Sequence, residues 1–218
     1  MLDQWLPKNV STFQSIDTLF MAIFYLTGVV FIGVTATLIY FIVKYRAQAG
    51  RRAEYTHGNT MLEIIWTSAT TLIVFILAMV SLPKWNEIKA EMPNANINIQ
   101  VTGKQFNWEV LYPGPDGEFN TDDDVLLDND MHVPVNEVIK VHLTSKDVIH
   151  SFFVPQMRLK QDALPGRLID LWFKATETGV YEIPCAELCG FGHSGMKGYL
   201  TVETPEAYAQ WLKEKYGE

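Results

Sequence analysis

Two long runs without a charged residue constrain this chain more than any other feature of its sequence. They cover residues 18–43 and 64–82. Because the hydrocarbon core of a bilayer needs about 20 apolar residues in a helix, each run is long enough to span a membrane and contact lipid. The alternatives are buried helices of a large soluble core and, for the first run, a cleaved signal peptide. The first run is longer than a signal-peptide core, so we expect a retained two-helix transmembrane hairpin.

The segment between the runs indicates how the hairpin is oriented. It carries four basic residues against two acidic ones, Lys44, Arg46, Arg51 and Arg52 against Glu54 and Glu63. Short loops rich in Lys and Arg stay in the cytoplasm. We therefore expect an extramembrane leader at 1–17, a hairpin with a cytoplasmic loop at 18–82, and a soluble domain at 83–218. The leader and the domain then lie on the outer side, which is the periplasm for a bacterial inner membrane.

The soluble domain has the sequence pattern of an all-β fold. Its expected strands are short, rich in β-branched and aromatic residues, and separated by turn residues: 97–103, 106–112, 137–145, 167–175, 179–184 and 198–203. Residues after Thr204 are helical in pattern, with Thr204 as the N-cap and Pro205 in the first turn. The pattern predicts a small β-sandwich or barrel followed by a short C-terminal helix.

The soluble domain is also acidic. From Pro83 onward it has 12 Lys and Arg against 21 Asp and Glu, which disfavours nucleic acid and suits a basic partner. Acidity that serves only solubility is the alternative. The densest cluster contains Asp122, Asp123, Asp124, Asp128 and Asp130. A calcium loop is a competing interpretation of it, but the spacing is not that of an EF-hand.

The stretch CAELCGFGHSGM holds four soft or borderline metal donors, Cys185, Cys189, His193 and Met196. His150 is a fifth donor, at the end of an expected strand that can bring it beside this loop. A blue-copper site uses one Cys, and this set has two. Two thiolates can bridge a pair of copper ions, which spreads the transferred electron over both. The alternatives are a local disulfide and a structural Cys₂His₂ zinc site.

These residues resemble the copper-bearing subunit II of haem-copper cytochrome c oxidases. The resemblance covers nearly the whole chain and rests on EIIWT, GKQFNW, DVIHSFFVPQMRLKQDALPGR and CAELCGFGHSGM. It implies a cupredoxin-like barrel that holds the dinuclear CuA centre. Its implied ligands are the side chains of His150, Cys185, Cys189, His193 and Met196 and the carbonyl of Glu187. The resemblance also implies a magnesium ion shared with subunit I through the Glu187 side chain, and haem only in subunit I.

Two further segments match the family outside the copper loop. Glu63 corresponds to an acidic residue at the entrance of a proton channel into subunit I. It begins an apolar run, where a carboxylate is costly unless it is paired, hydrated or used in proton transfer, and a simply hydrated glutamate is the alternative. Lys160, Asp162, Pro165, Gly166 and Arg167 match a motif that packs against subunit I.

The GKQFNW segment departs from the family at the position of electron entry. The family usually has Trp where this chain has Phe106, and Tyr where it has Asn107. Phe106 and Trp108 are both possible points of electron entry, and a buried core role is the alternative for Trp108. The chain has no CxxCH haem-attachment motif, so we expect a separate donor such as cytochrome c or another small basic protein.

The resemblance implies an electron-transfer subunit of a proton-pumping terminal oxidase. It would accept electrons from cytochrome c and pass them to haem in subunit I for reduction of O₂ to water, together with the other oxidase subunits. Two alternatives remain, a CuA subunit of a nitric oxide reductase and a non-respiratory membrane cupredoxin that carries copper. Glu63, Glu187 and KQDALPGR favour the oxidase, because a copper carrier needs none of them.

Overall fold

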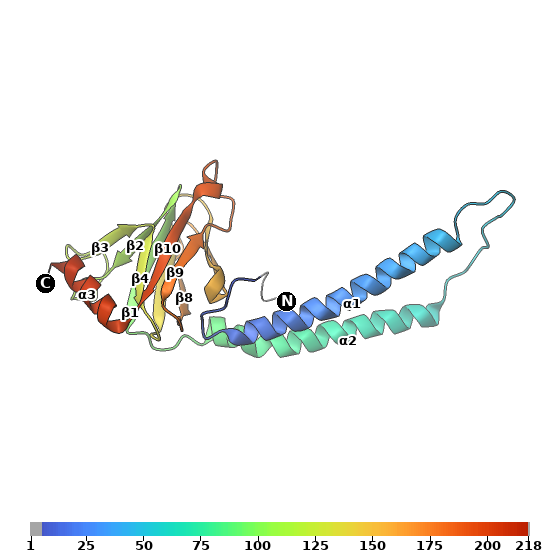
Figure 1. The fold of residues 1–218 in the computed structure, drawn as a ribbon, viewed down its shortest axis with the longest axis horizontal. Helices are drawn as coiled ribbons and strands as arrows, with labels where there is room; N and C mark the ends of the chain where they lie inside the picture. Colours follow the sequence, from blue (N-terminus) through green and yellow to red (C-terminus); the bar gives the residue numbers. More distant parts are fainter. Residues whose placement is uncertain (1–5, 218) are drawn as a thin grey trace. The chain divides into compact units, whose positions relative to one another are not determined.

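The computed structural model describes residues 6–217, which form two compact units. One unit is residues 15–86, and the other combines residues 6–14 with 87–217. The first five residues of the predicted leader lie outside the described part. Figure 1 shows a pair of long helices joined by a loop in the first unit and a layered β domain in the second.

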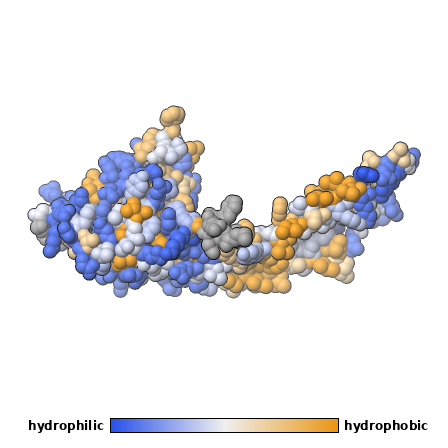
Figure 2. All heavy atoms as spheres, in the orientation of Figure 1, coloured by the Kyte–Doolittle hydropathy of each residue, from blue (hydrophilic) through white to orange (hydrophobic). Residues whose placement is uncertain are grey.

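The helical unit contains α1 (Gln14–Lys44) and α2 (Thr60–Trp85). Neither helix has a buried residue, and both are long and apolar enough to cross a bilayer. Figure 2 shows apolar side chains gathered on this unit, whereas polar side chains dominate the visible face of the β domain. A helix that exposes so much apolar surface requires an apolar solvent, which confirms the membrane anchor.

The helix ends extend beyond the uncharged runs. Asn59 caps α2 by accepting a hydrogen bond from the amide of Leu62 at 3.0 Å. Pro83 lies inside α2, and the helix continues to Trp85 before a π-helical turn, η2 (Asn86–Ala90). The polar residues after the apolar run therefore remain helical.

The β domain contains ten strands among the described residues. They are β1 (Ile97–Lys104), β2 (Asn107–Tyr112), β3 (Val125–Asp128), β4 (Asp130–Pro134), β5 (Ile139–Ser145), β6 (His150–Val154), β7 (Leu159–Ala163), β8 (Ile169–Phe173), β9 (Gly179–Pro184) and β10 (Lys197–Glu203). They form a five-stranded sheet of order β3-β2-β1-β5-β8, a three-stranded sheet β4-β10-β9 and a pair β6-β7. Two short 3₁₀ turns, η3 (Pro155–Met157) and η4 (His193–Gly195), and α3 (Pro205–Tyr216) complete the domain.

The core of the β domain follows from alternation along the strands. β5 alternates buried and half-buried residues without a break, and β1 does so over most of its length. Such a period of two sends every second side chain to one face. β1 pairs with β5 in parallel and with β2 in antiparallel register, and β10 pairs in parallel with β4. These pairings bury a continuous aliphatic core that includes Ile99, Val101, Val141, Leu143, Leu200 and Val202.

The small β6-β7 pair connects the sheets beside the metal-donor loop. Phe152 of β6 forms a bridge with Cys185, which directly follows β9. The amide of Ala186 also donates to the carbonyl of Ser151 at 3.0 Å. The barrel is therefore closed where the donors lie.

The β6 strand corrects one prediction about His150. This histidine begins β6, whereas the sequence predicts that it ends a strand. β5 already ends at Ser145, and the hydroxyl of Ser145 binds the carbonyl of Val148 in a tight turn. The next strand can therefore start at His150.

Residues 7–13, which we call the N-terminal strap, pack on the β domain. Val10 and Phe13 are buried, and the Phe13 ring meets Trp172 edge-on with the centroids 4.9 Å apart. The Val10 amide donates to the carbonyl of Gln156 at 2.9 Å, and the amide of Thr176 donates to the Val10 carbonyl at 2.8 Å. The predicted leader is thus partly a piece of the folded domain rather than a free segment.

The C-terminal helix forms as its cap predicts. The Thr204 side chain accepts a hydrogen bond from the amide of Ala207 at 3.3 Å, and Pro205 occupies the first turn. Tyr208 and Trp211 are its buried residues, and the Trp211 ring stacks on His132 of β4. The membrane hairpin, the β domain and the C-terminal helix predicted from the sequence are all confirmed.

Candidate metal centre

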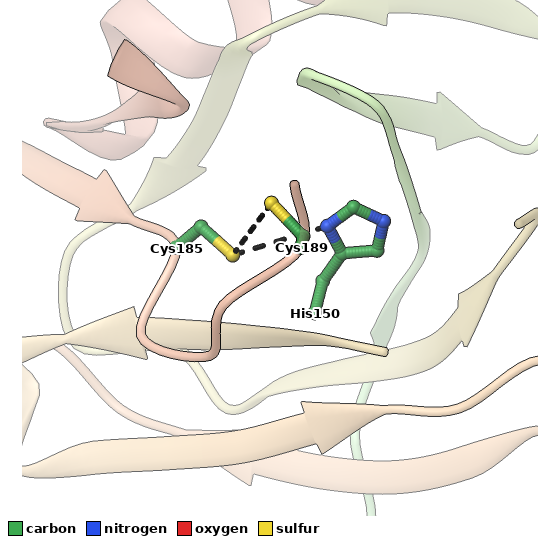
Figure 3. A group of neighbouring side chains, drawn as sticks. All are labelled: His150, Cys185 and Cys189. Atoms are coloured by element: carbon green, nitrogen blue, oxygen red, sulfur yellow. Dashed lines mark hydrogen bonds between the residues drawn. The ribbon is translucent and has the colours of Figure 1, made fainter. Parts of the chain in front are cut away.

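Five side chains from two segments converge at the closed edge of the β domain. His150 comes from the start of β6, and Cys185, Cys189, His193 and Met196 come from the loop between β9 and β10. The bridge between Phe152 and Cys185 explains why residues 35 positions apart in the sequence meet here. Figure 3 shows the Cys185 sulfur directed toward both the Cys189 sulfur and the His150 ring.

The donor atoms lie within a few ångströms of one another. The Cys185 Sγ is 3.8 Å from the Cys189 Sγ and 3.9 Å from the His150 Nδ1. The Cys189 Sγ is 3.6 Å from the His193 Nδ1 and 3.7 Å from the Met196 Sδ. Each sulfur therefore has one histidine nitrogen beside it, and both cysteines are free thiols.

The loop between β9 and β10 is closed at its base. The Cys185 amide donates to the Met196 carbonyl at 3.0 Å, which joins the first and last donors of the motif. Within the loop, the His193 amide donates to the carbonyl of Gly190 at 3.1 Å and begins η4. Gly190 has a φ of +133°, a conformation that side chains disfavour. The CxxxCxxxHxxM spacing therefore places four donors around one compact loop.

His150 is held in one orientation by Asp147. The His150 Nε2 lies 2.8 Å from the Asp147 Oδ1, so the ring donates its proton there and leaves the Nδ1 lone pair directed at Cys185. Burial by itself would raise the pKa of Asp147, but hydrogen bonds from His150 and from the amides of Gln105 and Val148 outweigh it and lower that pKa. Asp147 is therefore an ionised acceptor that orients His150.

The space around the His150 ring is filled. A Cβ on Gly103 would lie 2.9 Å from the His150 Cδ2 and 3.1 Å from Trp108. Trp108 is fully buried, meets His150 edge-on at 5.9 Å, and donates from Nε1 to the carbonyl of Ile183 at 3.1 Å. Trp108 is thus a core residue beneath the centre, which agrees with the alternative considered for it.

The centre is nearly dry. His150, Cys189 and Met196 are at most 3% exposed. Burial, together with the neighbouring Cys185, raises the pKa of the Cys189 thiol to about 11. Burial and a neighbouring thiol both disfavour the thiolate form, so a bound cation is what would stabilise two adjacent thiolates here. Among the described residues, His150, Cys185 and Cys189 form the one group of His, Cys, Asp and Glu close enough to share a metal ion.

The carbonyl and the carboxylate of Glu187 contact different neighbours. Its carbonyl lies 3.2 Å from the Cys185 Sγ, facing the donor cluster. Its carboxylate pairs with Lys160 of β7 at 2.9 Å, and Lys160 also contacts Asp162 at 3.2 Å. The hydrogen bond to Glu187 is the main reason that the pKa of Lys160 is raised.

Phe106 and Glu63 are predicted for roles other than metal binding. Phe106 is 39% exposed, and its ring covers the donor loop so closely that a Cβ on Gly192 would lie 2.5 Å from it. Glu63 is an exposed residue in the first turn of α2, in the other unit of the chain. The structure therefore places Phe106 at the rim of the centre, whereas Glu63 belongs to the other unit.

The acidic loop uses one of its carboxylates to hold itself together. The Asp124 side chain accepts hydrogen bonds from the amides of Gly114 and Asn120 and from the hydroxyl of Thr121, at 2.6 to 3.2 Å. These bonds outweigh burial and lower the pKa of Asp124. Asp124 is thus a turn-forming residue, whereas Asp122 and Asp123 remain exposed.

Sequence reasoning missed Asp147 and Gln105 as parts of the site. Asp147 lies three residues before His150, a spacing that allows a contact within a turn. Gln105 gives no such signal, because its side chain reaches the carbonyl of Cys189, 84 residues away. That contact follows only from the folded barrel.

Comparisons with known proteins agree with this geometry. Residues 97–203 match the family model described as cytochrome C oxidase subunit II, periplasmic domain, and residues 7–83 match the model for its transmembrane domain. Cytochrome c oxidase subunit 2 of Cereibacter sphaeroides is 35% identical over 84% of this chain and 70% of the relative. The alternative cytochrome c oxidase subunit 2 of Bradyrhizobium diazoefficiens is 29% identical over 97% of this chain and 84% of the relative.

One solved structure matches the β domain. The crystal structure of the periplasmic domain of cytochrome oxidase subunit II from Bradyrhizobium japonicum is 36% identical, with a TM-score of 0.52. The match covers 58% of this chain and 98% of that domain.

Proposed function

Because this chain belongs to the cytochrome c oxidase subunit II family, we propose that it is the electron-entry subunit of a terminal oxidase. In this role it accepts electrons from cytochrome c at a dinuclear copper centre and passes them to haem in subunit I. Proteins of this family are subunits of an oxidoreductase, which supports an electron-transfer role for this chain. The observation that carries the proposal is the meeting of two thiols, two imidazoles and one thioether in a single cluster, of which His193 is half-buried and the other donors are buried.

The donor set fits a pair of copper ions. Soft thiolate and thioether ligands together with imidazole suit copper, and a structural Cys₂His₂ zinc site has no use for Met196. Cys185, Cys189, His150, His193 and Met196 would hold the ions, with the Glu187 carbonyl as a further donor. When bound, the copper pair supplies a one-electron redox centre.

The residues around the donors keep the centre rigid and dry. Asp147 orients His150, the hydrogen bond from Cys185 to Met196 closes the donor loop, and Trp108 fills the space beneath. Fixed donors change position little when the charge of the site changes, which favours fast electron transfer. Exclusion of water has the same effect, because fewer solvent dipoles must reorient.

Electrons need an exposed edge at which to enter. Phe106 supports this role, because its half-exposed ring packs against the donor loop at Gly192. Trp108 is fully buried and is the weaker choice. The exposed carboxylates of Asp122 and Asp123 suit a basic donor that approaches by electrostatic steering. The entry role of Phe106 is tested by Phe106→Ala, which should slow reduction by the native donor and leave the copper spectrum unchanged.

Two carboxylates extend the proposal to the contact with subunit I. Glu63, at the cytoplasmic start of α2, would mark the entrance of a proton channel. Glu187 would provide one ligand to a magnesium ion shared with subunit I. The Glu187 carboxylate is paired with Lys160 at 2.9 Å, so it would have to leave this ion pair to bind the magnesium. A two-pass inner-membrane topology with both ends in the periplasm completes the proposal.

The test is copper reconstitution of the full-length chain in detergent. We expect two coppers per chain and an electron paramagnetic resonance spectrum with hyperfine structure from two equivalent ions. Assembly with subunit I should then give oxidation of cytochrome c coupled to O₂ consumption. A single copper with localised spin, or preferential binding of zinc, would contradict the copper pair. A two-copper protein that never associates with an oxidase subunit would instead indicate a copper carrier.

A further inference from the structure

Gln105 is linked to both halves of the metal centre from outside the ligand set, to His150 through Asp147 and to the donor loop directly. It lies between β1 and β2, in a turn that faces the start of β6 on one side and the donor loop on the other. The first half is His150, and the second is the donor loop between β9 and β10 with Cys185, Cys189, His193 and Met196. No ligand role falls to Gln105, because it offers an amide rather than a metal donor of the kind gathered here.

The backbone of Gln105 is bound to the His150 half. Its amide donates to the Asp147 Oδ2 at 2.7 Å. The other oxygen of Asp147 receives the His150 Nε2 at 2.8 Å and the Val148 amide at 2.6 Å. The amide of Lys146 also donates to the carbonyl of Gly103 at 2.9 Å. The turn at Gln105 and the imidazole of His150 are therefore parts of one hydrogen-bonded unit.

The side chain of Gln105 is bound to the other half. Its Nε2 donates to the carbonyl of Cys189, the residue whose sulfur lies beside both His193 and Met196. The contact is close, because a Cβ on Gly190 would lie 2.6 Å from this Nε2. Only glycine leaves room for the amide there. The next residue, Phe106, packs against Gly192 in the same way.

We propose that Gln105 is a positioning residue that fixes the Cys189 loop relative to His150. The inference rests on the proposed copper centre and goes beyond its ligand set. Without the side-chain amide, the Cys189 carbonyl loses its link to the Asp147–His150 unit. The two halves of the centre can then shift against each other, although the barrel itself remains folded.

The side chain of Gln105 is the part to change, because its backbone bond survives substitution. Gln105→Leu keeps the approximate size and removes the donor. Gln105→Glu keeps the shape and places a carboxylate against the Cys189 carbonyl, so it should be the more disruptive change. Gln210→Leu is the matched control, since Gln210 is an exposed glutamine of α3 that contacts Glu214.

The first measurement uses the metal-free full-length chain in detergent. Hydrogen exchange should rise at least several-fold in residues 189–196 of both Gln105 variants and stay unchanged in β1, β5 and β10. A purely structural role would instead raise exchange throughout the barrel, and no role would leave the loop unchanged. Either of these results would overturn the proposal.

The second measurement uses the copper-loaded chain. Both variants should retain two coppers, with a changed hyperfine splitting, a shifted reduction potential and several-fold slower reduction by a small ruthenium complex. A spectrum and potential equal to those of Gln210→Leu would overturn the role of Gln105 while the copper centre stands. A wild-type chain that takes up no copper pair would overturn the centre itself, and the positioning role with it.

Discussion

Replacement of Phe13 by alanine tests whether the N-terminal strap is an energetic part of the β domain. Phe13 is 1% exposed, and its ring contacts Trp172 edge-on with the centroids 4.9 Å apart. Full burial of a Phe side chain contributes about 1.5–3 kcal/mol, and an aromatic edge contact adds about 0.5–1.5 kcal/mol. The substitution should therefore lower the free energy of unfolding by about 2–4 kcal/mol.

The strap sets an upper limit on that loss. It is a short terminal segment held by three main-chain hydrogen bonds, from Val10, Thr12 and Thr176. A weakened strap can detach from the domain, and the remaining barrel then stays folded. The destabilisation therefore cannot exceed the free energy with which the strap docks, and detachment should expose residues 7–13 to protease.

The assay is urea unfolding of the full-length chain in detergent, followed by near-ultraviolet circular dichroism of the β domain. Phe191→Ala is the control, because it makes the same chemical change at a fully exposed position. We expect a clear fall in the transition midpoint for Phe13→Ala and almost none for the control. Equal midpoints, with cleavage in the strap at the wild-type rate, would refute the reasoning.

Three further predictions concern the centre, the membrane edge and an ion pair. Cys189→Ser should abolish the two-copper spectrum, because a hydroxyl is a poor copper ligand, and paramagnetic resonance measures this loss. Met196→Leu should keep two coppers and shift the reduction potential, which a redox titration measures. Glu63→Gln should slow turnover of the assembled oxidase without altering the copper spectrum, since it removes proton exchange and keeps size, and unchanged turnover would favour a simply hydrated glutamate. Burial would raise the pKa of Asp170, but its bond to Lys140 at 2.7 Å helps to outweigh burial and lower that pKa. A lowered pKa stabilises the fold above the ordinary value of 3.8 and loses this contribution as pH falls below it, so Asp170→Asn should cost up to about 1 kcal/mol at pH 6 and nothing near pH 2 in urea titrations.

The strands that the sequence predicts are those with regular alternation. β1, β5 and β10 place every second residue in the core, and this period is visible in the residues themselves. β6 is buried at four of its five positions, so its sequence shows no alternation. β3 and β7 are short strands at sheet edges, where packing imposes little pattern. These strands depend on tertiary pairing that single-sequence periodicity does not contain.

The candidate centre also has parts that the sequence predicts and parts that depend on tertiary contacts. Four donors lie within twelve residues, so the metal-binding chemistry of the loop can be predicted from the sequence alone. The proximity of His150 to Cys185 needs the barrel closure at Phe152. The contacts of Gln105 with Asp147 and Cys189 need it as well. Sequence reasoning therefore finds ligands more readily than the residues that position them.

The contacts between the N-terminal strap and the β domain also depend on how α1 and α2 are inserted in the membrane. Residues 7–13 are synthesised before both helices, yet they pair with Thr176 and Gln156, which are synthesised after both helices. If just one of α1 and α2 crossed the bilayer, the strap and its docking site would lie on opposite sides and never meet. A strap docked on the domain therefore excludes a chain in which only one of the two helices crosses the bilayer, and in such a chain Trp172 would lack its edge contact with Phe13.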